Sequence, residues 1–141
     1  MLFMIYFDYA ATTPLDPRVL DAMLPYFRES FGNPSSIHRY GQKAESAVDD
    51  AREKVAAVLH CRPEEILFTS CGSESDNLAL RGAALAKRKI SGQKWILTAR
   101  NEHHAVSKTA IQLEKEYGFL LEWLDLGEYG SVTPASLNKA V

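Results

Sequence analysis

A serine-rich turn, T-S-C-G-S-E at residues 69–74, lies between a short apolar run at 66–70 and a predicted helix that begins near Ser73. The first amides of a helix have no partner within it, and the helix dipole adds partial positive charge there. Gly72 lets the backbone approach a ligand closely, and the Ser73 hydroxyl adds a donor. The turn is therefore suited to bind a phosphate group at the carboxyl end of a parallel strand. An ordinary serine-capped turn, with Glu74 in the first helical turn, explains the same residues.

A second candidate segment, A-R-N-E-H-H-A-V at residues 99–106, follows the next predicted strand. Its two adjacent histidines, His103 and His104, project in different directions and do not form a metal pair. No other histidine or cysteine lies at ligand spacing, so no metal site is predicted. A histidine here is an ordinary capping or surface residue, or an imidazole placed to stack on a flat cofactor or to move a proton.

The elements that would position these residues follow from periodicity and capping. Residues 16–29 form an amphipathic helix with Asp16 as N-cap and Pro17 at its first position. The segment at 31–41 is dense in turn formers, and apolar spacing predicts a helix over about 42–59. The apolar start of the chain is predicted to be a buried strand rather than a signal peptide.

The second half of the chain alternates strands with helices. Strands are predicted at 66–70, 95–99 and 119–126, and helices at about 74–89 and 104–117. A turn at 127–132 then leads to a helix opened by Thr133 and Pro134. This alternation indicates βαβ crossovers and a parallel sheet. Three such strands and a short last helix indicate an incomplete α/β domain.

Composition excludes several classes of protein. The 141 residues carry a net charge of -2 with 46% hydrophobic residues, and basic and acidic residues are interspersed. We therefore expect neither nucleic-acid nor membrane binding, and no apolar run has the length of a spanning helix. Cys61 and Cys71 do not form a disulfide framework and are expected to be reduced thiols, as in the cytoplasm.

Four segments together resemble a known family. They are Y-F-D-Y-A-A-T-T-P-L-D-P-R-V at 6–19, G-N-P-S-S-I-H at 32–38, the run F-T-S-C-G-S-E-S-D-N-L-A at 68–79, and E-H-H-A-V at 102–106. Their order and spacing resemble the opening of cysteine desulfurases of the NifS and IscS kind, within the class V aminotransferases. The resemblance spans 6–141 without large gaps. It implies part of an α/β fold type I enzyme that uses pyridoxal 5′-phosphate (PLP), with a segment at 1–14 and an incomplete large PLP-binding domain at 15–141.

The resemblance also assigns roles to individual residues. The family's phosphate-binding Ala-Thr pair falls on Gly72 and Ser73, and its ring-stacking, proton-transferring histidine falls on His103. His104 takes a variable position. Cys71 replaces a glycine, so a positive φ at that position would be strained. Its thiol would have a lowered pKa at a helix N-terminus.

The family converts L-cysteine to L-alanine and leaves sulfur as a persulfide on an enzyme cysteine, for iron–sulfur cluster assembly. None of the lysines present is in the family's S-x-H-K setting, and no residue matches the persulfide cysteine. We therefore expect the 141 residues alone to be inactive. Another class V enzyme such as a selenocysteine lyase, or a non-catalytic module that binds a partner through its sheet edge, remains an alternative.

Association with other chains is the last expectation. Apolar strands at an open sheet edge pair with other chains unless the edge is protected. We therefore expect a homodimer or association with the remaining polypeptide. The resemblance further implies a sulfur-acceptor or scaffold protein as a partner.

Overall fold

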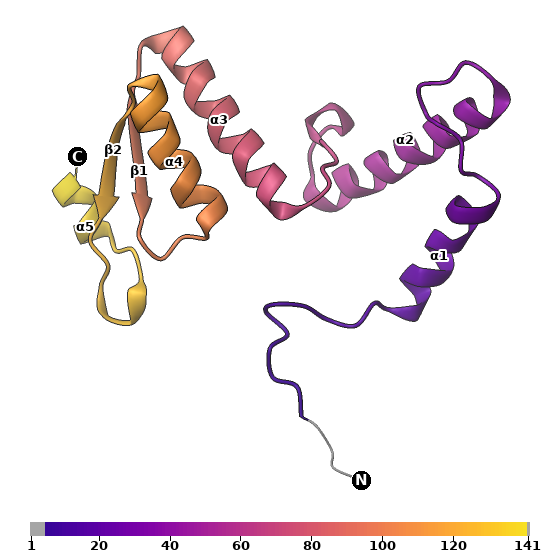
Figure 1. Ribbon diagram of the computed structural model, residues 1–141, viewed down its shortest axis with the longest axis horizontal. Coiled ribbons are helices and arrows are strands. Elements are labelled where there is room, and N and C mark those ends of the chain that lie inside the picture. The colour runs from indigo at the N-terminus through magenta and orange to yellow at the C-terminus, as the bar shows by residue number, and fades with distance from the viewer. Residues whose placement is uncertain (1–4, 141) are drawn as a thin grey trace. The chain divides into compact units, whose positions relative to one another are not determined.

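The computed structural model describes residues 5–140 and divides into two compact units, Met1–Leu67 and Phe68–Val141 (Figure 1). The boundary predicted from the sequence at residues 14 and 15 concerns the domains of the family and stays a prediction.

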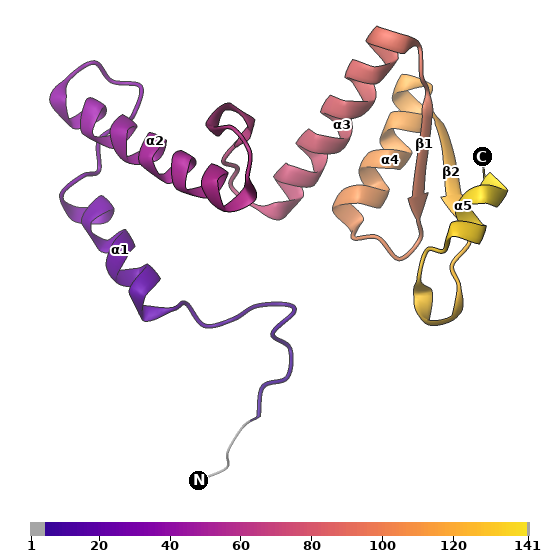
Figure 2. The same cartoon turned by 180° about the vertical axis from the view of Figure 1, so that it is seen from behind.

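The second unit is built around one βαβ crossover. Strand β1 (Trp95–Ala99) pairs in parallel with β2 (Leu120–Leu124), from Trp95 opposite Leu120 to Ala99 opposite Leu124. Helix α4 (His104–Tyr117) connects them, with the bounds that its periodicity predicts. Helices α3 (Gly72–Ser91) and α4 lie on one side of the strands, and α5 (Pro134–Ala140) lies on the other (Figures 1 and 2). The predicted α/β class with a parallel sheet is confirmed.

The core of this unit lies between α4 and the sheet. Ala110 and Leu113 of α4 are fully buried and pack with Ile96 of β1 and Phe119. Leu80 and Ala84 of α3 are partly buried and pack against this cluster. Burial of these side chains stabilises the crossover, because each fully buried large aliphatic or aromatic side chain contributes roughly 1.5–3 kcal/mol.

The prediction of a strand at 66–70, the first of the three expected, is wrong. Within the described residues the sheet has two strands, and 66–69 belong to neither a helix nor a strand. The Ile66 amide donates to the Pro63 carbonyl at 3.1 Å, and the Ile66 carbonyl accepts from Arg52 at 2.6 Å. A strand needs another segment to complete its hydrogen bonds, and the backbone of Ile66 instead bonds to Pro63 and to the Arg52 side chain of α2.

The first unit contains α1 (Pro17–Arg28), α2 (Arg39–Leu59) and a short 3₁₀ turn, η1 (Pro63–Glu65). The predicted cap of α1 is confirmed, since Asp16 accepts a hydrogen bond from the Arg18 amide at 2.8 Å. The loop between α1 and α2 is tightly closed: a Cβ on Gly32 would lie 2.1 Å from the Tyr40 carbonyl oxygen. The glycines of this segment thus permit contacts between backbone atoms.

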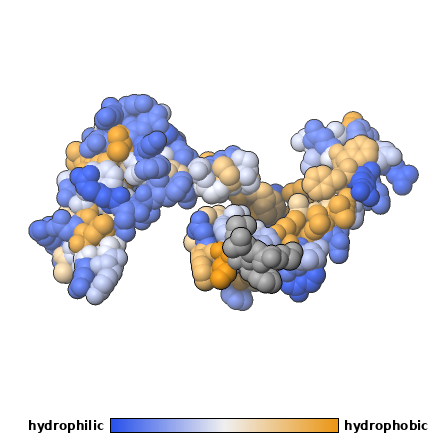
Figure 3. All heavy atoms as spheres, turned by 60° about the horizontal axis from the view of Figure 1, so that its bottom comes forward, coloured by the Kyte–Doolittle hydropathy of each residue, from blue (hydrophilic) through white to orange (hydrophobic). Residues whose placement is uncertain are grey.

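Much apolar surface of the first unit is exposed. Figure 3 shows apolar side chains gathered over α1 and α2 on its visible face. No residue of α1 is buried. The buried strand predicted at the start of the chain is not formed by residues 5–8, where Ile5 is 71% exposed and Phe7 is 89% exposed. The remainder of that prediction, residues 1–4, lies outside the described residues. The periodicity at 16–29 correctly predicted helix α1. Its apolar face is not buried, because burial requires a partner surface.

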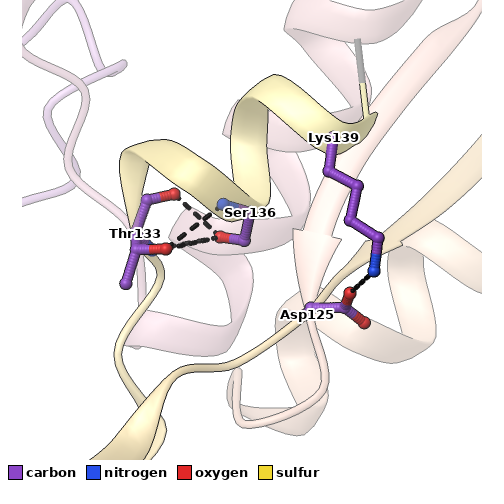
Figure 4. Close-up of polar contacts among 4 residues, drawn as sticks. All are labelled: Asp125, Thr133, Ser136 and Lys139. Carbon is purple, nitrogen blue, oxygen red and sulfur yellow. Dashed lines mark hydrogen bonds and ion pairs between the residues drawn. The ribbon is translucent and has the colours of Figure 1, made fainter.

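The connection after β2 positions α5. Leu126 bridges Val132 across the turn that the sequence predicts, and the Gly127 amide donates to the Ser131 carbonyl at 2.8 Å. Thr133 and Ser136 then cap α5 reciprocally, with the Ser136 amide 3.2 Å from the Thr133 hydroxyl (Figure 4). Lys139 pairs with Asp125 at 2.5 Å, which ties the helix to the end of β2 (Figure 4).

Candidate functional site

The turn before α3 is held in shape by side chains. Glu74 accepts hydrogen bonds from both the amide and the hydroxyl of Ser70, at 2.6 and 2.7 Å. These bonds lower the pKa of Glu74, so its carboxylate is ionised at neutral pH. The hydroxyls of Thr69 and Ser75 lie 2.6 Å apart across the same turn. The turn is therefore pre-organised before any ligand arrives.

The N-terminus of α3 presents amides that have no partner within the helix. The first intrahelical bond is donated by the Ser75 amide to the Cys71 carbonyl, at 3.1 Å. The amides of Gly72, Ser73 and Glu74 precede it and point out of the helix. A Cβ on Gly72 would meet no atom within 4 Å. Gly72 therefore allows, but does not require, the close approach predicted for it, and an alanine fits there equally well.

Cys71 is not strained. Its φ of -166° and ψ of 168° are those of extended backbone, so the positive φ that would strain a cysteine here does not occur. Its exposed sulfur accepts a hydrogen bond from the Ser70 hydroxyl at 3.8 Å. The pKa of the thiol is lowered, as predicted, mainly by the Glu74 amide, then by the Ser70 hydroxyl and to a smaller extent by the Ser73 amide. The sulfur thus lies on the same amides that would receive a phosphate. Both cysteines are free thiols.

We expect alkylation of Cys71 by iodoacetamide to reach half its maximal rate at a pH below that of an ordinary thiol, because the thiolate is the reacting species. Ser70→Ala removes one donor and should move this midpoint to higher pH. Rates followed by mass spectrometry of the peptide containing Cys71 give the curve, and Cys71→Ser identifies the signal. A midpoint at or above the ordinary thiol pKa would contradict the hydrogen-bonding arrangement.

His103 begins α4 as its N-cap. Its Nδ1 accepts a hydrogen bond from the Ala105 amide at 3.1 Å, which a loop-to-helix junction favours. With Nδ1 as acceptor, the proton of the neutral ring is assigned to Nε2. The His104 ring lies 6.2 Å away, tilted by 46°. The Nδ1 of His103 is therefore bonded to the helix backbone, and its Nε2 can donate to a ligand.

A hollow of about 320 Å³ in the second unit brings the predicted residues together. Ser73 lines it from α3, and His103 and His104 line it from the start of α4, so the hollow does not distinguish the two histidines. Gly72 is not part of its lining. Among the described residues no aspartate or glutamate lines the hollow, whereas Arg81 and Lys108 do. The hydroxyl of Ser73 and the cationic groups of Arg81 and Lys108 are donors suited to an anionic ligand.

Several residues of this hollow carried no sequence signal. Asn77 and Arg81 lie one and two helical turns after Ser73, while Lys108, Thr109 and Gln112 lie on α4. Their spacing matches that of any amphipathic helix, so only the packing of α3 against α4 identifies them. No group of three or more potential metal ligands occurs among residues 5–140. In the same range no helix is both long and apolar enough to cross a membrane.

The chain belongs to the aminotransferase class-V family, which matches residues 5–141. A putative cysteine desulfurase, IscS 1 of Bacillus subtilis, is 45% identical over 137 residues, covering 97% of this chain and 35% of that protein. The cysteine desulfurase IscS of Vibrio cholerae is 49% identical over 140 residues, again 97% of this chain and 34% of its own length. This chain thus spans about a third of these relatives.

Solved structures agree with this assignment. A NifS-like protein superimposes with a TM-score of 0.87 at 40% identity, over 99% of this chain and 37% of that one. DndA from Streptomyces lividans has a TM-score of 0.77 at 36% identity, over 97% and 38% of the two chains. The predicted class V membership is confirmed, and with it the partial α/β fold of PLP-dependent enzymes.

Proposed function

We propose that this chain is the N-terminal part of a PLP-dependent cysteine desulfurase, which converts L-cysteine to L-alanine and transfers sulfur to an enzyme cysteine as a persulfide. The supporting observation is the hollow that joins the N-terminus of α3 with His103 and contains no carboxylate among its described lining residues. The 45–49% identity to cysteine desulfurases favours this class over other class V enzymes.

The residues present fit the phosphate of PLP. The amides of Gly72 and Ser73 and the Ser73 hydroxyl would hold it, because they are donors at the positive end of a helix dipole. Arg81 and Lys108 add positive charge to the same hollow. The ordered turn lowers the entropy cost of binding, since its hydrogen bonds exist before the ligand arrives.

His103 would lie against the ring of the cofactor and hold a proton at Nε2. The Ala105 hydrogen bond to Nδ1 fixes the ring orientation and leaves Nε2 as the exchanging atom. When bound, PLP supplies the electron sink that weakens bonds at the substrate's α-carbon. The covalent lysine and the persulfide cysteine have no match among the 141 residues, so we propose that turnover requires further polypeptide.

The remaining parts of the proposal follow from the family. We propose a homodimer in the cytoplasm that delivers sulfur to an acceptor or scaffold protein for iron–sulfur cluster assembly. The exposed apolar surface of α1 and α2 supports association, because patches of this kind mark interaction sites.

Ser73→Ala should weaken binding of pyridoxine 5′-phosphate by about 1–2 kcal/mol, the loss of one hydrogen bond to a charged group. This compound has no aldehyde, so it does not react with surface lysines. Calorimetric titration gives the dissociation constants. Gly82→Ala, on α3 outside the lining of the hollow, is the control and should bind as the unchanged chain does, because its Cβ would meet no atom within 4 Å. Equal affinity of the Ser73→Ala variant, or no binding by the unchanged chain, would overturn the proposed site.

A further inference from the structure

The two candidate site residues lie on different helices. Ser73 is in the first turn of α3, and His103 caps α4 thirty residues later in the chain. The apolar contacts between these helices come from Leu80 and Ala84, more than one turn beyond Ser73. Apolar packing is not directional, so it does not by itself fix how the two N-termini face each other.

A polar bridge joins the helices closer to the site. Asn77 donates from Nδ2 to the Ser73 carbonyl at 2.9 Å, and its Oδ1 accepts from the Thr109 hydroxyl at 2.7 Å. Thr109 lies on α4 and is only 3% exposed. Asn77 thus contacts the phosphate-binding turn with one end of its amide and the histidine-bearing helix with the other.

The surroundings fix the orientation of this amide. Arg81 donates to the Asn77 Oδ1 at 3.4 Å and also to Gln112 of α4. With two donors directed at Oδ1, the amide cannot flip without placing its NH₂ against the Arg81 guanidinium. Hydrogen bonds are directional, and the buried Thr109 hydroxyl would lose its acceptor if the helices shifted, which is costly. The bridge therefore favours one register of α3 against α4.

We propose that Asn77 and Thr109 are positioning residues that hold the α3 N-terminus and His103 at the separation needed to bind a phosphorylated pyridine at both ends. This inference rests on the proposed function. A ligand that uses both helices needs their separation fixed, because a small misplacement of binding groups is felt strongly. A ligand that binds only the α3 N-terminus does not need a fixed separation between the two helices.

Two ligands distinguish a role in positioning both helices from a role at the α3 N-terminus alone. The unchanged chain and its variants are titrated with pyridoxine 5′-phosphate and with inorganic phosphate, and binding is followed by NMR at the Ser73 amide and the His103 ring. Thr109→Val retains the shape of the side chain and removes the hydroxyl. It should raise the dissociation constant of pyridoxine 5′-phosphate on the order of fivefold, the equivalent of one hydrogen bond, and leave that of phosphate unchanged. Thr109→Ser should restore the affinity.

The control for general destabilisation is Thr133→Val, which removes a capping hydroxyl at α5 in the same unit. It should change neither affinity. If Thr109→Val does not fold, Thr109→Ala takes its place. Its dissociation constants are then measured at a temperature where its Trp fluorescence equals that of the folded unchanged chain. Equal weakening of both ligands, or no rescue by serine, overturns the positioning role. Failure of the unchanged chain to bind pyridoxine 5′-phosphate would instead overturn the proposed function.

Discussion

Gly41→Ala is expected to disrupt the loop that opens α2 and to lower the free energy of unfolding of the first unit by about 3 kcal/mol or more. An added Cβ would lie 2.0 Å from the Ser36 carbonyl oxygen and 2.8 Å from that of Asn33. Both are backbone atoms, which cannot rotate away as a flexible side chain does. The loop must therefore open, and the cap that His38 provides to the Gly41 amide at 3.3 Å is lost with it.

Hydrogen exchange followed by mass spectrometry measures this effect in peptides covering residues 32–59. The emission of Trp95 and Trp123, which both belong to the second unit, should stay unchanged. The matched control is Gly82→Ala within α3, where a Cβ would meet no atom within 4 Å. That variant should stabilise its helix by up to about 1 kcal/mol. Equal protection of the loop in Gly41→Ala and the unchanged chain would refute the close backbone approach.

Leu113→Ala should destabilise the second unit by about 2–5 kcal/mol, the usual cost of a cavity in a packed core. Leu113 has no exposed surface and is the largest fully buried side chain in the described part of the chain. It contacts the cluster that joins α4 to β1 and to Phe119, with α3 packed against it. Loss of this side chain should also weaken pyridoxine 5′-phosphate binding, because the hollow is formed by α3 and α4.

Urea denaturation followed by Trp emission reports this unit directly, since the tryptophans lie on β1 and on β2. Ile90→Ala is the control, because Ile90 lies on α3 with 82% of its surface exposed. Its effect should stay within about 0.5 kcal/mol. If the two variants shared one denaturation midpoint, the core assigned to Leu113 would be wrong.

The sequence by itself determined the elements whose signals are local. Asp16 with Pro17, and Thr133 with Pro134, predicted two helix starts that the structure has. Apolar periodicity predicted α4, and the alternation of strands and helices predicted the parallel pair β1 and β2. Caps and periodicity are properties of neighbouring residues, so these elements need no knowledge of the rest of the fold.

The candidate site was predicted in part. The turn at 69–74 and His103 were selected because each was expected to follow a parallel strand at the same edge of the sheet. Strand β1 does precede His103, but the strand expected before the turn at 69–74 is not formed. The hollow does bring Ser73 and His103 together. Their roles toward PLP stay predictions that the titrations described above test.

Only the tertiary structure decided the features that depend on distant partners. The run at 66–70 has the composition of a strand, yet the Ile66 carbonyl is bound by Arg52 of α2 instead of a sheet neighbour. The Asn77–Thr109 bridge joins residues that are 32 positions apart and resemble any polar helix residues in sequence. Hydrogen-bond partners and burial are set by which surfaces meet in three dimensions, and no local pattern encodes that.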